Sequence, residues 1–361
     1  SFSIELLTAN NNYLKLIDQA KLFKVKNVLI RNKKFYKKVK YSLKNSNTKV
    51  FYGNTPITKI LKKKIDCTVS SIVGIAGLQP TLEVMKLSRK VAIANKEAII
   101  CGWPILLKYK KKYKNEIIPI DSEHFSIMEL TKEYKDNEIE EIVITASGGP
   151  FLKTPLNRFK KIKPAQAIKH PNWKMGKKIS IDSANLMNKI FEVIEATKIF
   201  DFNKKKYKII IHPQSYIHSI IRFKNGLIKM ILYNTDMKIP ISNILYEGNN
   251  IFPKSKNIDI KTLNSLNFKK VDKKKFPSIK LLDKCLNSGP SAPTIANASN
   301  EVLVDMFLKG KIRFIDIVPT INKIFKDKEF KKYAKKKAET IKIIKTIDNW
   351  ARLKTKDLCV R

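Results

Sequence analysis

The strongest constraint on the fold of this chain is a regular alternation of short β-branched runs with amphipathic stretches. The runs that predict strands lie at residues 2–7, 27–30, 48–51, 66–73 and 90–94. Helical periodicity occupies the intervals between them, for example at 13–23 and 78–87. Such alternation is typical of a parallel sheet covered by helices, which binds ligands beyond the carboxyl ends of its strands. We therefore predict an α/β protein that begins with a Rossmann-like parallel sheet.

A glycine-rich turn after the first strand is normal in a dinucleotide-binding sheet, because bare backbone lets a pyrophosphate approach a helix N-terminus. The first glycine of this chain is Gly53. The chain begins at Ser1, and its first strand resembles the second strand of such a sheet. We expect one strand–turn–helix unit, the first of the sheet, to be missing from this sequence.

The rest of the chain divides by composition into three further segments. Residues 112–246 mix strands with a strong helix at 184–199, which predicts an α/β catalytic domain after a truncated nucleotide-binding domain at 1–111. Residues 247–272 are rich in Asn, Lys and Pro and predict a linker. Residues 273–361 have helical periodicity throughout and predict a small C-terminal bundle.

Composition excludes several classes of protein. Hydrophobic residues make up 43% of the chain, which is ordinary for a globular protein. No apolar run is long enough to span a membrane, and no export signal is visible. The four cysteines are far apart and form no CxxC pair, which suits a reducing compartment. We predict a cytoplasmic protein that does not bind a membrane.

The formal net charge of +42 raises the alternative of a nucleic-acid-binding protein. The lysines, however, occur in many separate clusters along the chain. A nucleic-acid-binding surface more often interleaves arginine and aromatic residues on one element. We therefore predict a solvated, lysine-rich surface that attracts anionic metabolites, and no nucleic-acid partner.

Two acidic motifs are candidates for a metal site. Asp121 and Glu123 follow a predicted strand at a spacing of two, which can place both carboxylates on one side of an extended segment. In the predicted helix at 184–199, with Asp182 or Ser183 as its N-cap, one face carries a carboxylate, an amide and an ammonium group. These three residues are Asn188, Lys189 and Glu192. The simpler alternatives are a helix cap or solvated loop for the first motif and an exposed ion pair for the second.

Two further motifs are candidates for substrate binding. The string SGGP from Ser147 predicts a tight turn whose N–H groups and hydroxyl can hold an anion, with a simple turn as the alternative. Residues 168–180 form a polar loop with Trp173 and Met175, which favours an apolar lid over a ligand. A buried Trp that staples the loop is the alternative. All four histidines, His124, His170, His212 and His218, fall inside these polar motifs, which favours functional over structural roles.

Strings over nearly the whole chain match one family. They are VGIAGLQPT (73–81), IANKEAII (93–100), PIDSEH (119–124), SGGPF (147–151), HPNWKMGKKISIDSANLMNK (170–189), HPQSYIHS (212–219), DMKIPI (236–241) and APTIANASNEVLV (292–304). Together they closely resemble the 1-deoxy-D-xylulose 5-phosphate reductoisomerase family. The string at 170–189 is highly specific for it.

The resemblance implies an enzyme of non-mevalonate isoprenoid precursor biosynthesis. Members rearrange 1-deoxy-D-xylulose 5-phosphate and reduce it with NADPH to 2-C-methyl-D-erythritol 4-phosphate. They use Mg²⁺ or Mn²⁺ and act as homodimers. A truncated, inactive remnant that still binds a divalent metal and a sugar phosphate is the alternative.

The resemblance also implies roles for individual residues. The metal ligands are Asp121, Glu123 and Glu192, and these three with Lys96 and Glu97 form the catalytic set. The substrate-binding residues are Lys96, Ser122, Glu123, Ser147, His170, Ser183, Asn188, Lys189 and Glu192. The lid residues are Trp173 and Met175. The NADPH-binding residues are Asn10, Asn11, Asn12, Gly74, Gly77, Asn95, Glu97 and Gly176. One departure concerns this cofactor: Ile190 stands where the family commonly has a small residue, and its bulk could crowd the nicotinamide.

Overall fold

The computed structural model describes residues 2–173, 175–246 and 257–360, and the chain forms two compact units. The first unit comprises Ser1–Thr68, Gln79–Val91 and Tyr109–Glu116, and the second comprises Val69–Leu78, Ala92–Lys108 and Ile117–Arg361. No helix in the described part of the chain has both the length and the apolar composition needed to cross a membrane.

The first unit contains a parallel three-stranded sheet of order β1-β2-β3, as the alternating pattern predicts. Its strands are β1 (Leu6–Ala9), β2 (Asn27–Ile30) and β3 (Lys49–Tyr52), and its helices are α1 (Tyr13–Leu22), α2 (Tyr36–Ser42) and α3 (Ile57–Ile60). Apolar side chains of β2, α1 and α2 form the core, because each helix turns one apolar face to the sheet. Asn12 caps α1 by accepting a hydrogen bond from the N–H of Lys15 (3.3 Å).

A second three-stranded sheet has the order β4-β5-β6. Its strands are β4 (Ile65–Ser70), β5 (Ser88–Ile93) and β6 (Glu116–Pro119), and the helices between them in sequence are α4 (Leu78–Met85) and α5 (Lys96–Tyr113). The ends of β5 and β6 matter most for function, because the chain continues from them into Lys96 and Asp121.

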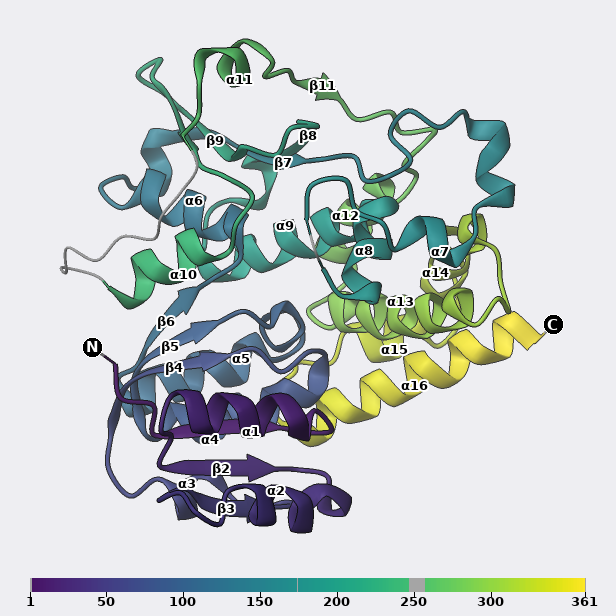
Figure 1. The fold of residues 1–361 in the computed structure, drawn as a ribbon. Coiled ribbons are helices and arrows are strands. Elements are labelled where there is room, and N and C mark those ends of the chain that lie inside the picture. Colours follow the sequence, from purple (N-terminus) through teal and green to yellow (C-terminus); the bar gives the residue numbers. More distant parts are fainter. Residues whose placement is uncertain (1, 174, 247–256, 361) are drawn as a thin grey trace. The chain divides into compact units, whose positions relative to one another are not determined.

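The second unit contains a mixed five-stranded sheet of order β10-β9-β7-β8-β11 (Figure 1). Its strands are β7 (Ile139–Ala146), β8 (Tyr207–Ile211), β9 (Ile217–Phe223), β10 (Ile228–Leu232) and β11 (Lys269–Lys270). β7 pairs parallel to β8 and antiparallel to β9. Helices α6 (Ser122–Thr131) and α9 (Met187–Ile199) cover one face, where apolar side chains such as Ile127, Ile142 and Val193 are fully buried. The chain between α6 and residue 246 also contains the helices α7 (Pro164–Ala167), α8 (Lys177–Ala184) and α10 (Lys238–Leu245).

The predicted linker at 247–272 falls partly outside the described residues, at 247–256. Residues 257–272 contain a short helix, α11 (Ile260–Asn264), and the edge strand β11, which pairs antiparallel to β8. The domain boundaries expected from composition stay a prediction.

The C-terminal segment is helical, as expected. Its helices are α12 (Ile279–Asn287), α13 (Ala292–Leu308), α14 (Ile317–Phe325), α15 (Phe330–Ala334) and α16 (Ile341–Val360). α13 packs against α12, α14 and α16, and its small buried residues Ala292 and Ala298 let neighbouring helices approach closely. On α16, Ile344, Ile347 and Ala351 are buried at the spacing of one helical face.

Candidate active site

The first acidic pair lies at the start of a helix. Asp121 is the N-cap residue of α6, and Glu123 lies in its first turn. The prediction that Asp121 and Glu123 lie on an extended segment is therefore wrong. The N–H of Phe125 donates to the carbonyl of Asp121 (2.8 Å), which closes the first helical turn there. Both carboxylates consequently lie near the positive end of the helix dipole.

Asn188, Lys189 and Glu192 of the second acidic motif lie on one helix, α9, but this helix begins later than predicted. α8 ends at Ala184 and α9 begins at Met187, and Leu186 between them has a left-handed backbone (φ 63°). Asp182 and Ser183 lie inside α8, so the prediction that one of them caps the helix is wrong. The side chain of Asn185 accepts a hydrogen bond from the N–H of Met187 (2.9 Å), so a capping signal was present in the sequence.

These segments surround a cavity of about 240 Å³ in the second unit. The predicted residues that line it are Lys96, Asp121, Ser122, Glu123, Ser147, His170, Trp173, Met175, Ser183, Asn188, Lys189 and Glu192. His218, for which the sequence favoured a functional role, also lines it. The lining residues outside the prediction are Ala94, Thr145, Ile179, Ser215 and Met237. Ser215 and Met237 fall in strings that carried the family resemblance, which was the signal that could have identified them.

Three carboxylates meet in this cavity. Asp121, Glu123 and Glu192 each place an oxygen within 4.8 Å of the others. Glu123 and Glu192 are almost fully buried. Charged groups from two separate segments have thus been brought together largely out of water, which requires compensating charge.

Two buried ammonium groups supply that compensation. Lys96 Nζ lies 3.1 Å from Asp121 Oδ2 and 3.3 Å from Glu192 Oε1, and it donates to Asn188 Oδ1 (2.7 Å). Lys189 Nζ lies 2.5 Å from Glu123 Oε1 and 2.6 Å from Glu192 Oε2. Three negative and two positive groups leave the cluster with a deficit of positive charge, which a divalent cation could fill.

The two glutamates differ in acidity. Burial tends to raise the pKa of Glu123, but the ammonium group of Lys189 and the nearby ring of His218 hold it well below its usual value. Burial and the neighbouring Glu123 charge raise the pKa of Glu192 to about 7, and Lys189 only partly offsets them. Glu192 is therefore the carboxylate whose charge depends on pH near neutrality.

A neutral histidine faces a serine on another wall of the cavity. The Nδ1 atom of His170 accepts hydrogen bonds from the N–H groups of Asn172 (3.2 Å) and Trp173 (3.0 Å). The proton therefore resides on Nε2, which lies 2.9 Å from Ser147 Oγ. Burial and the charge of Lys189 lower the pKa of His170 to about 4. Near neutral pH this histidine is an uncharged hydrogen-bond donor.

The turn that follows Ser147 has the close packing that requires glycine. A Cβ on Gly149 would come within 2.8 Å of the Ala184 backbone, and the φ of Gly149 is 64°. The N–H of Gly149 donates to Ser147 Oγ (3.1 Å). This N–H is therefore engaged inside the turn, rather than exposed as the predicted anion nest requires.

The four histidines do not share one role. His170 and His218 line the cavity, whereas His124 and His212 do not. His124 Nε2 contacts the Glu192 carbonyl (2.9 Å), and His212 Nδ1 contacts the Asn267 carbonyl (2.9 Å). His124 also lies with Asp121 and Glu195 in a second group of side chains that could hold a cation. The functional interpretation of His124 and His212 therefore stays a prediction.

The residues expected to bind the cofactor lie in both units. Asn10, Asn11 and Asn12 connect β1 to α1 in the first unit. In the second unit, Asn95 Nδ2 donates to the Gly74 carbonyl (2.9 Å), and Asn95 Oδ1 accepts from the N–H of Ala98 (2.9 Å).

Gly77, Gly176 and Glu97 complete the expected cofactor set in the second unit. A Cβ on Gly77 would collide with the Asn95 side chain, so only glycine fits there. Gly176, the N-cap residue of α8, has open space around it. Glu97 pairs with Lys178 (2.8 Å). Ile190 is fully buried and does not line the cavity, and its expected crowding of the nicotinamide stays a prediction.

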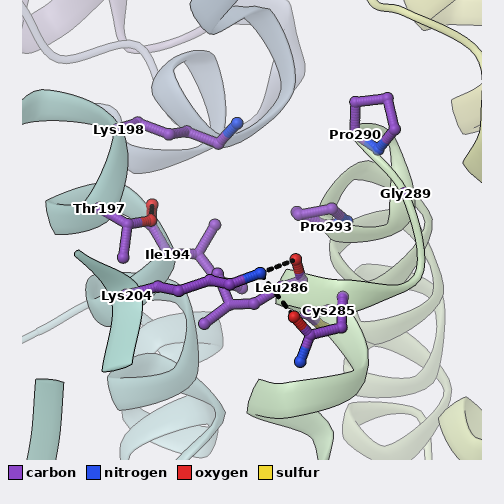
Figure 2. A pocket seen from close by; sticks show the side chains of 10 residues that line it. Ile194, Thr197, Lys198, Lys204, Cys285, Leu286, Gly289, Pro290 and Pro293 are labelled. Carbon is purple, nitrogen blue, oxygen red and sulfur yellow. Dashed lines mark hydrogen bonds between the residues drawn. The ribbon is translucent and has the colours of Figure 1, made fainter. Parts of the chain in front are cut away.

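A second pocket, of about 310 Å³, has different chemistry (Figure 2). Figure 2 shows Lys204 reaching across it, where its Nζ donates to the Leu286 carbonyl (3.3 Å) and the Asn287 side chain (2.5 Å). Its lining includes two lysines and no carboxylate. A cation would find no charged ligand there, so the smaller cavity is the candidate metal site.

The fold and the cavity define a class of protein. An α/β unit that places three carboxylates beside lysine, serine and neutral histidine has the groups for a divalent cation next to an anionic ligand. Sites of this kind are typical of metal-dependent enzymes that act on phosphorylated metabolites.

Comparisons with known proteins identify the family within that class. Residues 1–102 match the family model described as 1-deoxy-D-xylulose 5-phosphate reductoisomerase. Residues 117–200 and 232–354 match two models of the C-terminal domain of the same enzyme.

Individual relatives agree. The 1-deoxy-D-xylulose 5-phosphate reductoisomerase of Pelagibacter ubique is 48% identical over 362 residues, covering 100% of this chain and 93% of the relative. The enzyme of the same name from Wolbachia pipientis wMel is 42% identical over 325 residues, covering 89% of this chain and 82% of the relative. The chain therefore belongs to the 1-deoxy-D-xylulose 5-phosphate reductoisomerase family.

Solved structures support the same assignment. The Zymomonas mobilis reductoisomerase in complex with NADPH superimposes with a TM-score of 0.90 at 32% identity, covering 99% of this chain and 92% of that one. A DOX-P reductoisomerase in complex with NADPH, fosmidomycin and magnesium also gives a TM-score of 0.90, at 30% identity, covering 99% of this chain and 91% of that one.

Proposed function

We propose that this chain catalyses the NADPH-dependent rearrangement and reduction of 1-deoxy-D-xylulose 5-phosphate to 2-C-methyl-D-erythritol 4-phosphate, a step of non-mevalonate isoprenoid precursor biosynthesis. Membership of the family supports the reaction. The observation that carries the proposal is the meeting of Asp121, Glu123 and Glu192 in one cavity with Ser147 and His170.

Asp121, Glu123 and Glu192 would hold the divalent cation, Mg²⁺ or Mn²⁺. Their oxygen ligands suit a hard cation, and magnesium is present in solved structures of relatives. When bound, such a cation polarises carbonyl and alkoxide oxygens and stabilises the charge that develops during carbon–carbon rearrangement. Lys96 and Ser122 contact these carboxylates or lie beside them, so they would orient the reacting end of the substrate.

Other polar groups that line the cavity suit the phosphate group. Ser147, His170, Ser183, Asn188 and Lys189 supply hydroxyl, imidazole, amide and ammonium donors from several directions. Because His170 is neutral with a proton on Nε2, it can donate to a phosphate oxygen without a change of charge.

Trp173 and Met175 line the cavity from the loop before α8, where they would exclude water from the reaction. NADPH would bind through Asn10, Asn11 and Asn12 in the first unit. In the second unit it would bind through Gly74, Gly77, Asn95, Glu97 and Gly176. Solved relatives of the family contain this cofactor.

The function is tested by following NADPH absorbance at 340 nm. We expect NADPH oxidation only when both 1-deoxy-D-xylulose 5-phosphate and Mg²⁺ are present. We expect EDTA to abolish it, because EDTA removes the cation that stabilises the charge developing on the substrate. Binding of metal and sugar phosphate without NADPH oxidation would instead identify an inactive remnant. Oxidation without the ketose phosphate would contradict the proposal.

The acidity of Glu192 predicts how cation affinity depends on pH. Cation binding must displace the proton of Glu192, whose pKa is raised to about 7, so affinity should fall as pH falls below 7 and level off above 8. We expect the Kd for Mg²⁺ to be about tenfold weaker at pH 6 than at pH 8, from the ionised fractions of one such group. Calorimetric titrations check this. An equal Kd at both pH values would contradict the role of Glu192 as a ligand.

We also propose that the protein is a cytoplasmic homodimer. β10 lies at one edge of the five-stranded sheet, and Leu227, Ile228 and Met230 on or beside it are exposed. An exposed apolar edge strand is a surface that a second copy could cover. A monomeric mass in sedimentation at micromolar concentration would contradict the dimer.

A further inference from the structure

Lys178 is a half-buried cation close to the lid that the function described above does not use. It lies in the first turn of α8, two residues after Gly176 and three after Met175. Its Nζ is 2.8 Å from Glu97 Oε1 and 3.2 Å from Asp182 Oδ2. The ammonium group thus joins the end of the lid segment to the beginning of α5.

Both of its partners are buried carboxylates. Glu97 is 5% exposed and Asp182 is 2% exposed. Asp182 also accepts a hydrogen bond from Asn300 Nδ2 on α13 (2.7 Å), which fixes its position from the other side. The ion pairs that Glu97 and Asp182 form with described residues both end on Lys178, so this one charge compensates two buried acids.

The start of α5 is where this contact bears on the active site. Glu97 follows Lys96 directly, and Lys96 Nζ reaches Asp121, Asn188 and Glu192. Asn95 precedes it and holds the Gly74 carbonyl. A shift of this one helical turn would therefore move the ammonium group that contacts the carboxylate cluster.

We propose that Lys178 is a positioning residue: its bonds to Glu97 and Asp182 couple the lid residues Trp173 and Met175 to the orientation of Lys96. When the lid is in place, α8 holds the first turn of α5, and Lys96 points into the carboxylate cluster. The inference rests on the proposed function, because its effect on turnover requires that reaction.

The test compares Lys178→Met with Lys178→Arg in the full chain. Methionine keeps most of the side-chain volume and removes the charge, so we expect kcat to fall by about 10- to 100-fold, the range for a misplaced catalytic group. KM for the ketose phosphate should change by less than about threefold, because the phosphate donors are untouched. Arginine keeps the charge and should restore kcat to within about threefold of the parent chain. Lys177→Met, an exposed neighbour, is the matched control and should match the parent.

A second readout does not depend on turnover. Amide hydrogen exchange at residues 175–180 should be faster in Lys178→Met than in the parent chain or Lys178→Arg, because the lid end is released. If Lys178→Met fails to fold, Lys178→Met combined with Asp182→Asn removes one of the two stranded charges and should show the same loss of kcat. Parent-like kcat in a folded Met variant, or unchanged exchange, would overturn the inference. A parent chain without turnover would refute the proposed function, and exchange would still decide whether Lys178 holds the lid.

Discussion

Replacing Glu192 by glutamine is expected to lower kcat by about 10³-fold while leaving the protein folded, since cation stabilisation of the transition state contributes several kcal/mol. Glutamine has nearly the same shape but cannot complete a set of three charged ligands. Glu192 is also the carboxylate whose pKa burial and Glu123 raise to about 7, so neutralising it removes repulsion within the cluster. Thermal stability without metal should therefore be equal to or above that of the parent chain.

NADPH oxidation at saturating substrate and Mg²⁺ gives the kinetic result, and calorimetry shows the loss of cation affinity. Glu133→Gln is a suitable control, because Glu133 is exposed at the beginning of the loop after α6. Turnover of the Glu192→Gln enzyme within about tenfold of the parent would be incompatible with the metal assignment.

Replacing Lys189 by methionine is expected to lower the stability of the protein strongly, whereas Glu192→Gln should keep or raise it. Its ammonium contacts both Glu123 and Glu192 while only 8% exposed, so its removal leaves buried carboxylates without a partner. Breaking a buried pair in this way costs about 3–5 kcal/mol. The free energy of unfolding, measured by urea denaturation, should fall by that order without metal and recover partly when Mg²⁺ supplies positive charge.

Catalysis should also suffer in the Lys189→Met variant, because a charged donor to the phosphate is lost. We expect kcat/KM to fall by about 10²-fold or more, given the strength of charge-assisted hydrogen bonds. Lys198→Met is the matched control on the same helix, since Lys198 forms no ion pair with a described residue. Equal unfolding free energies for the two variants would show that Lys189 does not compensate the cluster.

The general fold could be predicted from local patterns, because strand and helix periodicities differ and their alternation restricts the sheet topology. The parallel sheet of the first unit and the helical C-terminal segment follow from them. β11 could not be found this way, because its two lysines lack an apolar pattern and depend on β8 for pairing. The break at Leu186 was also missed, since leucine rarely adopts positive φ.

The site was predictable only in part from local spacing. Asn188, Lys189 and Glu192 share a helical face, and spacing alone indicated this. No local rule brings Glu192 to Asp121 and Glu123, which are distant in sequence, so the family resemblance supplied that connection. His218 lies on β9 and lines the cavity. β9 pairs with β7, and sequence patterns do not specify this pairing.

The left-handed backbone of Leu186, between α8 and α9, changes the directions in which side chains of the two helices project. In one uninterrupted helix, Ser183 and Glu192 would be nine residues apart and would project about 180° from each other. The turn at Leu186 resets this angle, and both side chains line the same cavity. Leu186 is buried beside Ala146, Ile211 and Phe276, and this burial offsets the roughly 1 kcal/mol cost of its backbone angle. One short stretch of chain can thereby place a hydroxyl and a carboxylate in the same cavity.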